Sequence, residues 1–316
     1  MDNILRMAAE IDAGSASLVK RDDQHAGETH ILKNKNGLEA KITHYGARLV
    51  GLLIPIRHGN PIDVIAGSDK PNALRDGKNS SWAVAWDAEK IDHHAVRLTY
   101  FSKNAEEGFP GNLKVKRTYF LNEDNGLKIV YEAVTDKTAV INLANNPFFN
   151  LNGGACGNIL NHQVSIKADK YIPIDINMSP TEVEEPVAGT PFDFRNSATI
   201  GSRINDHHDQ LKIGHGYDHH FVLNPHASRT PVARIRGDKS GITMEVFTDQ
   251  PGLHFYSGNF IRGKVKRKAD EFDYYHSFFA VRIRHYNDLT TQPGFPMTML
   301  RPGQVYRSVC CFQFKN

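Results

Sequence analysis

Hydrophobic and polar residues alternate with a period of two along much of this chain. Such alternation is typical of half-buried β-strands, in which successive side chains point to opposite faces of a sheet. The alternating runs lie at 38–45, 113–119, 127–133, 164–168, 242–246 and 279–285. No long segment with the period of a helix lies between them, and only 197–205 and the first 20 residues have room for short helices.

Turn-forming sequences separate these runs at short intervals. They are Asn-Gly at 36–37, Gly-Asn-Pro at 59–61, Asp-Asn-Gly at 124–126, Asn-Gly-Gly at 152–154 and Pro-Gly at 302–303. Many short strands joined by such turns predict an all-β sandwich. No repeat of fixed period and no linker is present, so we expect one domain over residues 28–316, preceded by a loosely held extension at 1–27.

Composition limits the classes of partner. The chain has 316 residues, of which 40% are hydrophobic, and this is enough for a large core. Lys and Arg number 38 against 35 Asp and Glu, a net charge of +3, and the densest basic run, 264–268, is interpreted as a solvated loop. We therefore expect no nucleic-acid partner. No stretch of 18 apolar residues exists, so we expect no membrane partner either.

The cysteines and the N-terminus favour a reducing, cytoplasmic location. Three cysteines cannot build a disulfide framework. Cys310 and Cys311 are neighbours and should point to opposite faces of a strand, while Cys156 stands alone. The first residues carry several charges and lack the apolar core of a signal peptide.

Histidines are abundant, but their spacing does not predict a metal site. The chain has 16 of them, and the cluster at 215–220 contains His219 and His220 side by side. Neighbours on a strand diverge, whereas a zinc site needs three or four converging ligands. We therefore expect no metal and no cofactor. The common nucleotide-binding loop and serine-hydrolase motifs are also missing from the sequence.

Seven signatures, in order, resemble those of one enzyme family. They read THYGARL (43–49), EGFPGNL (107–113), NLANNPFFNL (142–151), LNHQV (160–164) with PVAGTPFDF (186–194), GYDH (216–219), TDQPGLHFYSGNF (248–260), and HYND (285–288) with FP (295–296) and LRPGQVY (300–306). The family is that of the aldose 1-epimerases, or galactose mutarotases. The resemblance runs from about Leu38 to Phe314 and implies a supersandwich of antiparallel sheets with an open cleft on one face.

The resemblance also implies a chemistry. Family members open a sugar ring with a glutamate as general base and a histidine as general acid. A second histidine, an aspartate and an arginine bind the sugar hydroxyls. Carried over residue by residue, the acid histidine falls on His162 and the aspartate on Asp218.

Three of the five family positions are changed or missing. Arg282 stands where the family has its glutamate, Arg284 replaces a following glutamine, and Asn146 replaces the second histidine. The family's arginine motif is absent from the short interval 67–86, in which nothing aligns Arg75 with it. Arginine cannot accept a proton as a general base. We therefore do not expect ordinary mutarotation much above its uncatalysed rate.

Several hypotheses stay open. In the first, the scaffold is a repurposed isomerase, cyclase or lyase acting on a small carbonyl- or acid-bearing metabolite. There, Arg282 and Arg284 share a strand face and make the cleft floor electropositive, and His162 serves as acid or base. Weaker contributors to such a site are Tyr217, His220, His254 and Tyr286.

The alternatives are a non-catalytic protein that binds a carbohydrate or metabolite, and a residual hexose mutarotase. A purely structural interpretation is that the arginines pair with nearby carboxylates and that His162 is a hydrogen-bonded remnant. In each case the partner is a small molecule, and we expect a monomer or a weak homodimer.

Overall fold

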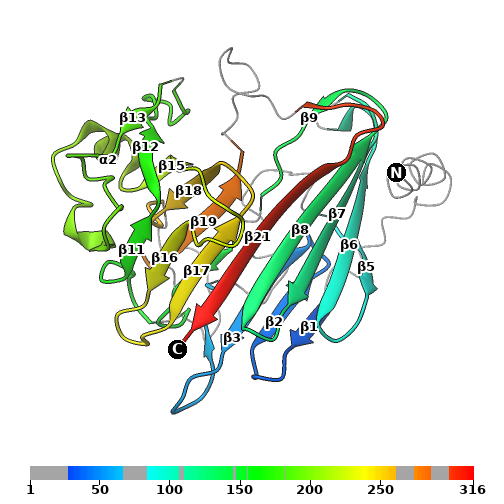
Figure 1. Cartoon of the computed structure of the whole chain (residues 1–316), viewed down its shortest axis with the longest axis horizontal. Coiled ribbons are helices and arrows are strands. Elements are labelled where there is room, and N and C mark those ends of the chain that lie inside the picture. The colour runs from blue at the N-terminus through cyan, green and yellow to red at the C-terminus, as the bar shows by residue number, and fades with distance from the viewer. Residues whose placement is uncertain are drawn as a thin grey trace.

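The computed structural model describes residues 28–66, 84–106, 110–144, 147–154, 156–181, 183–260, 274–285 and 299–316. Strands dominate these residues, and every strand pairing among them is antiparallel, which confirms the all-β fold predicted from the alternation (Figure 1). The expected extension at 1–27 lies outside the described residues.

The larger layer is a nine-stranded sheet. In spatial order it contains β14 (Ala198–Thr199), β11 (Gln163–Ile166), β16 (Ala233–Arg236), β17 (Thr243–Thr248), β21 (Tyr306–Lys315), β8 (Gly126–Thr135), β7 (Leu113–Leu121), β6 (Ala95–Ser102) and β5 (Asp87–Lys90). The long strand β21, red in Figure 1, pairs with β17 on one side and β8 on the other. It therefore joins two halves that are distant in sequence.

A six-stranded sheet forms the second layer. Its order is β10 (Phe148–Phe149), β19 (Phe279–Arg284), β18 (Gly252–Tyr256), β15 (Asp218–Leu223), β12 (Ala168–Ile172) and β13 (Glu185–Pro186). The smaller elements are β1 (Thr29–Lys33), β2 (Glu39–Thr43), β3 (Arg48–Ile54) and β4 (Ile62–Asp63) in one sheet, the pair β9 (Ala139–Val140) and β20 (Met299–Leu300), the 3-10 helix η4 (Ile200–Ser202), and helix α2 (Asp209–Gly214).

The main core lies between the six- and nine-stranded sheets. The ring of Phe149 on β10 lies 5.3 Å from that of Phe312 on β21 and 5.7 Å from that of Phe279 on β19, measured between centroids. Along β19, Phe279, Val281 and Ile283 are buried in this core. The alternate side chains of β19 therefore point to the opposite, outer face of the six-stranded sheet.

The four-stranded sheet is tied to β7 by a buried arginine. Arg117 Nη1 and the hydroxyl of Tyr119 each donate a hydrogen bond to the carbonyl of Ala47, at 2.8 Å. The guanidinium carbon of Arg117 also lies about 5 Å from the ring centroids of Trp86 and Tyr131.

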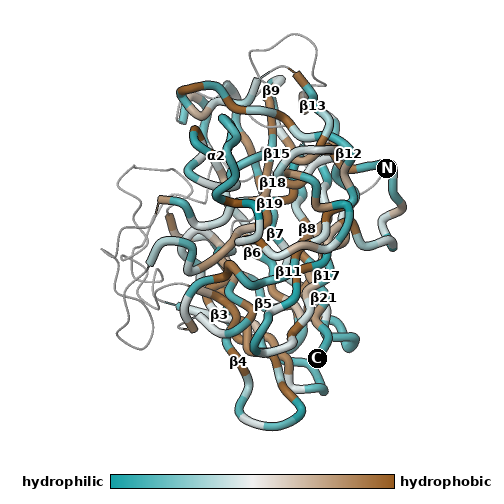
Figure 2. The backbone as a smooth tube through the Cα atoms, turned by 90° about the vertical axis from the view of Figure 1, so that its left-hand side faces the viewer, coloured by the Kyte–Doolittle hydropathy of each residue, from teal (hydrophilic) through white to brown (hydrophobic). Residues whose placement is uncertain are grey.

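In Figure 2 the loop between β3 and β4 ends in a hydrophilic tip, away from this core.

The structure corrects two details of the sequence analysis. The run 164–168 is not one strand, because β11 ends at Ile166 and β12 begins at Ala168, so the chain changes sheets at Lys167. The segment 197–205 holds the predicted short helix as η4, but α2 was not predicted. Among the described residues, no helix has the length and apolar character needed to cross a membrane.

The cysteines follow the predicted alternation. Cys310 is buried and Cys311 is half-buried on β21, and Cys156 is exposed. All three are free thiols, so none of them cross-links the fold.

Candidate functional site

The outer face of the six-stranded sheet carries a pocket of about 180 Å³. In the strand register, His220 on β15 lies opposite His254 on β18, and His254 lies opposite Arg282 on β19. Side chains at these positions share one face, and so do those two residues away. The pocket is lined by Ile172, Ile174, Met178, Pro180, Asp218, His220, His254, Arg282 and Arg284.

Arg282 and Arg284 share this face, as their two-residue spacing predicted. Both side chains are half-buried and both line the pocket. The guanidinium carbon of Arg282 lies 5.8 Å from the ring centroid of Tyr256, at cation–π distance. The pocket floor therefore holds two permanent positive charges.

Asp218 and His254 form a short contact in the same pocket. His254 Nε2 lies 2.6 Å from Asp218 Oδ1, and the two side chains are 7% and 18% exposed. Burial raises the pKa of Asp218, although Arg282, His219 and Arg284 oppose this rise. Burial holds the pKa of His254 well below its usual range, and the positive charges of Arg284 and Arg282 lower it further. Neutral His254 thus donates from Nε2 to the carboxylate, and its Nδ1 has no hydrogen-bond partner among the described residues.

His219 supports Asp218 from beneath the sheet. Its Nδ1 accepts a hydrogen bond from the Asp218 backbone N–H at 3.0 Å, and its Nε2 lies 3.2 Å from Gln210 Oε1 on α2. The ring packs against Tyr171 and Phe192, with centroids 6.0 and 4.5 Å away. His219 and His220 therefore diverge, as expected for neighbours on a strand.

His220 fills the floor of the pocket over a glycine. It is 2% exposed, and a Cβ atom built on Gly252 would collide with its Nε2. Burial holds the pKa of His220 well below its usual range. The nearby His254, Arg284 and His285 lower this pKa further by electrostatic repulsion. The ring is therefore neutral at pH 7 and adds no positive charge to the floor.

Tyr217 and His162 do not line the pocket. Tyr217 is fully buried, and its hydroxyl donates to the Pro191 carbonyl at 3.2 Å. His162 is also fully buried, and its ring lies 6.0 Å from that of Phe279, on the side of the six-stranded sheet opposite Arg282. The structure thus contradicts the expectation that His162 and Arg282 share one cleft. The reason is that His162 directly precedes β11 of the nine-stranded sheet and its side chain lies in the interior.

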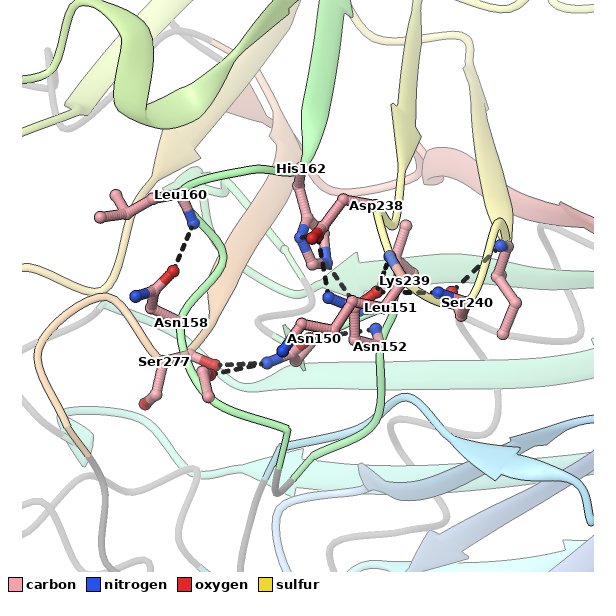
Figure 3. A network of polar contacts seen from close by, with 12 residues as sticks. Asn150, Leu151, Asn152, Asn158, Leu160, His162, Asp238, Lys239, Ser240 and Ser277 are labelled. Carbon is pink, nitrogen blue, oxygen red and sulfur yellow. Dashed lines mark hydrogen bonds and ion pairs between the residues drawn. The ribbon is translucent and has the colours of Figure 1, made fainter.

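His162 belongs instead to an interior polar network (Figure 3). Its Nε2 accepts a hydrogen bond from the Leu151 backbone N–H at 3.1 Å, and its Nδ1 lies 3.2 Å from Asp238 Oδ1. Burial lowers the pKa of His162 to about 4, although Asp238 opposes the shift. Asn152 Nδ2 also donates to Asp238, at 2.9 Å. The network therefore ties the loop after β10 to the hairpin between β16 and β17.

Two further predicted site residues, Asn146 and Tyr286, lie outside the described residues, as does Arg75. The sequence analysis also missed one wall of the pocket, formed by Ile172, Ile174, Met178 and Pro180. The apolar run at 171–174, followed by the turn-forming residues Asp175 and Asn177, was its only signal. Aliphatic side chains bear no reactive group, and in sequence a pocket wall made of them looks the same as a core strand.

Comparison with known proteins identifies relatives for most of the chain. The family model described as aldose 1-epimerase matches residues 75–313. Galactose mutarotase from Rattus norvegicus is 38% identical over 246 residues, which cover 78% of this chain and 70% of the rat protein. The human galactose mutarotase is also 38% identical, over 79% of this chain and 71% of its own length. Aldose 1-epimerase from Escherichia coli K12 is 28% identical over 90% of this chain and 94% of its own.

Solved structures agree with the fold. A GalM/aldose epimerase homologue from C. elegans superposes with a TM-score of 0.81 at 22% identity, over 92% of this chain and 99% of that one. A galactose 1-epimerase from Lactobacillus acidophilus gives a TM-score of 0.70 at 26% identity, over 90% and 93% of the two chains.

Proposed function

The chain belongs to the aldose 1-epimerase family, and from this premise we propose that its pocket binds a small sugar-type metabolite bearing an anionic group. The observation that carries the proposal is the pair Arg282 and Arg284, which line one pocket with a single carboxylate, Asp218, among the described lining residues. Guanidinium groups hold carboxylates and phosphates through charge-assisted hydrogen bonds. Guanidinium N–H groups can also donate to the hydroxyls of a neutral hexose, but only an anionic group pairs with their charge.

The family resemblance supports a changed chemistry at the same site. It implies that Arg282 occupies the position of the catalytic glutamate, and arginine cannot accept a proton. On our proposal Asp218 is the proton acceptor, because its pKa is raised by burial and its carboxylate is oriented by His254.

The reaction that suits these groups is an isomerisation beside a carbonyl. Asp218 removes a proton from the carbon next to the carbonyl, and Arg282 stabilises the negative charge that develops on the oxygen. When that carbon bears a hydroxyl, its proton is delivered to the former carbonyl carbon, and the hydroxyl proton passes to the former carbonyl oxygen. The carbonyl thus moves by one carbon, and no co-reactant is consumed. This proposal gives His162 no part in the chemistry, since it lies buried outside the pocket.

A second candidate function, mutarotation of a neutral hexose, is favoured by the similarity to galactose mutarotases. It would require Asp218 to replace the family glutamate as base. The two candidates differ in the charge of the ligand, so binding and rate measurements distinguish them.

The first experiment compares galactose, galacturonate and galactose 6-phosphate by calorimetric titration. We expect the anionic sugars to bind more tightly, and Arg282→Gln to weaken them by about 10- to 100-fold, the usual effect of one charged hydrogen bond. Arg236→Gln, on an exposed residue of β16 in the other sheet, is the matched control. Equal binding of neutral and anionic sugars, or indifference to Arg282→Gln, would contradict the proposal.

The second experiment follows the optical rotation of freshly dissolved α-galactose and α-glucose. We expect the uncatalysed rate with the wild-type protein. An acceleration that disappears in Asp218→Asn would establish the mutarotase function and refute ours.

A further inference from the structure

We infer that the ligand also carries an apolar part, which packs against the side chains of Ile172, Ile174, Met178 and Pro180, here called the aliphatic wall. This inference rests on the proposed function for the anionic end of the ligand, and it adds the chemical character of the other end. The ligand class is then an amphipathic acid, such as a sugar acid or sugar phosphate with a deoxy carbon, a methyl ether or a short alkyl substituent.

The pocket is divided into two chemically different halves. The polar half comes from β15, β18 and β19, and the aliphatic wall comes from β12 and the hairpin that follows it. Ile172 lies opposite His220 in the register, so the wall begins directly beside the polar floor. The wall offers no side-chain donor, and its one side-chain acceptor is the weakly accepting sulfur of Met178. A hydroxyl pressed against it would lose its water without gaining a hydrogen bond, whereas a hydrocarbon group would gain from burial.

The hairpin that carries the wall is held rigidly. Ile174 and Pro180 form an isolated antiparallel bridge. The carboxylate of Asp175 accepts hydrogen bonds from the backbone N–H groups of Asn177 and Ser179, at 2.9 and 2.8 Å. Gln210 on α2 binds both backbone groups of Ile174, at 2.7 and 3.0 Å. A surface fixed in this way meets a ligand with little loss of conformational freedom.

Met178 has an unusual backbone conformation for its side chain. Its φ is 63°, in the left-handed region that a long side chain such as methionine seldom adopts. Ile176, two residues earlier on the same hairpin, is 81% exposed and does not line the pocket. The hairpin therefore turns one hydrophobic side chain into the pocket at the cost of backbone strain and leaves another in solvent.

The test uses linear carboxylates of increasing length, from acetate to hexanoate, in calorimetric or NMR titrations. On this inference affinity rises by about fourfold for each added methylene until the wall is covered, as the transfer free energy of a methylene predicts. Met178→Asn keeps a residue that tolerates the left-handed conformation and replaces the apolar contact. It should flatten the rise with chain length, so that hexanoate loses more affinity than acetate. Ile176→Asn, on the same hairpin, is the control and should leave the rise intact.

The outcomes separate the two proposals. Binding that depends on Arg282 but not on chain length, or a rise with chain length that survives Met178→Asn, overturns the inference about the wall alone. If no carboxylate binds in an Arg282-dependent manner, the anionic site itself is refuted, and the inference falls with it.

Discussion

At the scale of single residues, the floor of the pocket depends on a glycine, Gly252, which has no side chain. Gly252 leaves the space that the ring of His220 occupies, and it pairs with Arg284 on the neighbouring strand β19. A methyl group at Gly252 would need the same volume. The position of the ring, and with it the shape of the pocket, therefore depends on glycine at this site.

Gly252→Ala should destabilise the protein by about 1–3 kcal/mol, the range of overpacking in a well-packed interior. The free energy of unfolding in urea measures the effect. The same substitution in a His220→Ala background supplies the control and should cost less, because removal of the ring leaves the backbone oxygen of Arg284, at 3.0 Å, as the nearest remaining neighbour of the methyl group. An equal loss of stability in both backgrounds would show that the ring is not the obstacle.

The sequence predicted the position of a side chain correctly where that position follows from one strand alone. It failed where the position depends on how two sheets pack. The alternation along β19 placed Arg282 and Arg284 on one face, and the register agrees. The motif resemblance assigned His162 to a family position, but it could not show that this residue, directly before β11, is buried in the interior. Which face of which sheet a residue meets is a property of packing between distant segments.

At the scale of elements, the sequence predicted the existence of strands better than their ends. The alternating run at 164–168 contains no break, yet the chain leaves one sheet and enters the other at Lys167. Helix α2 is six residues long, too short for a helical period to be recognised. It ends at Gly214, and His215 in the left-handed conformation caps it.

The hairpin of the aliphatic wall should loosen when its turn loses Asp175. We expect Asp175→Ala to lower the free energy of unfolding by about 1 kcal/mol, since two backbone N–H groups lose their acceptor to water. It should also reduce the gain in affinity with carboxylate chain length. Urea denaturation and the titration series measure the two effects. Glu89→Ala, which removes an exposed ion pair with Arg97, should change neither. If Asp175→Ala behaves like this control, the turn is not what fixes the wall.

At the scale of the whole molecule, the sheets enclose histidines that must stay neutral. His162 and His219 are fully buried, and burial lowers their pKa values to about 4 and about 3. Below pH 6.5 the unfolded chain binds protons at these positions before the folded chain does. Each residue therefore contributes stability that is present above pH 6.5 and is lost as the pH falls toward its folded-state value.

The loss due to His162 should amount to about 3 kcal/mol between pH 6.5 and pH 4, from the difference between its ordinary and folded-state pKa values. Urea denaturation across this pH range measures it. In His162→Gln the stability curve should be flatter over the same interval, whatever the absolute stability of the variant. A slope equal to that of the wild-type protein would mean that His162 does not titrate in this range.

The hydrogen bond between the Leu151 amide and His162 Nε2 has one more consequence. The acceptor of this amide is a ring nitrogen whose lone pair disappears when the ring binds a proton. The chemical shift of the Leu151 amide proton should therefore change when the buried ring of His162 becomes protonated. Its exchange with deuterium should accelerate over the same pH range, because the amide then loses its hydrogen-bond acceptor.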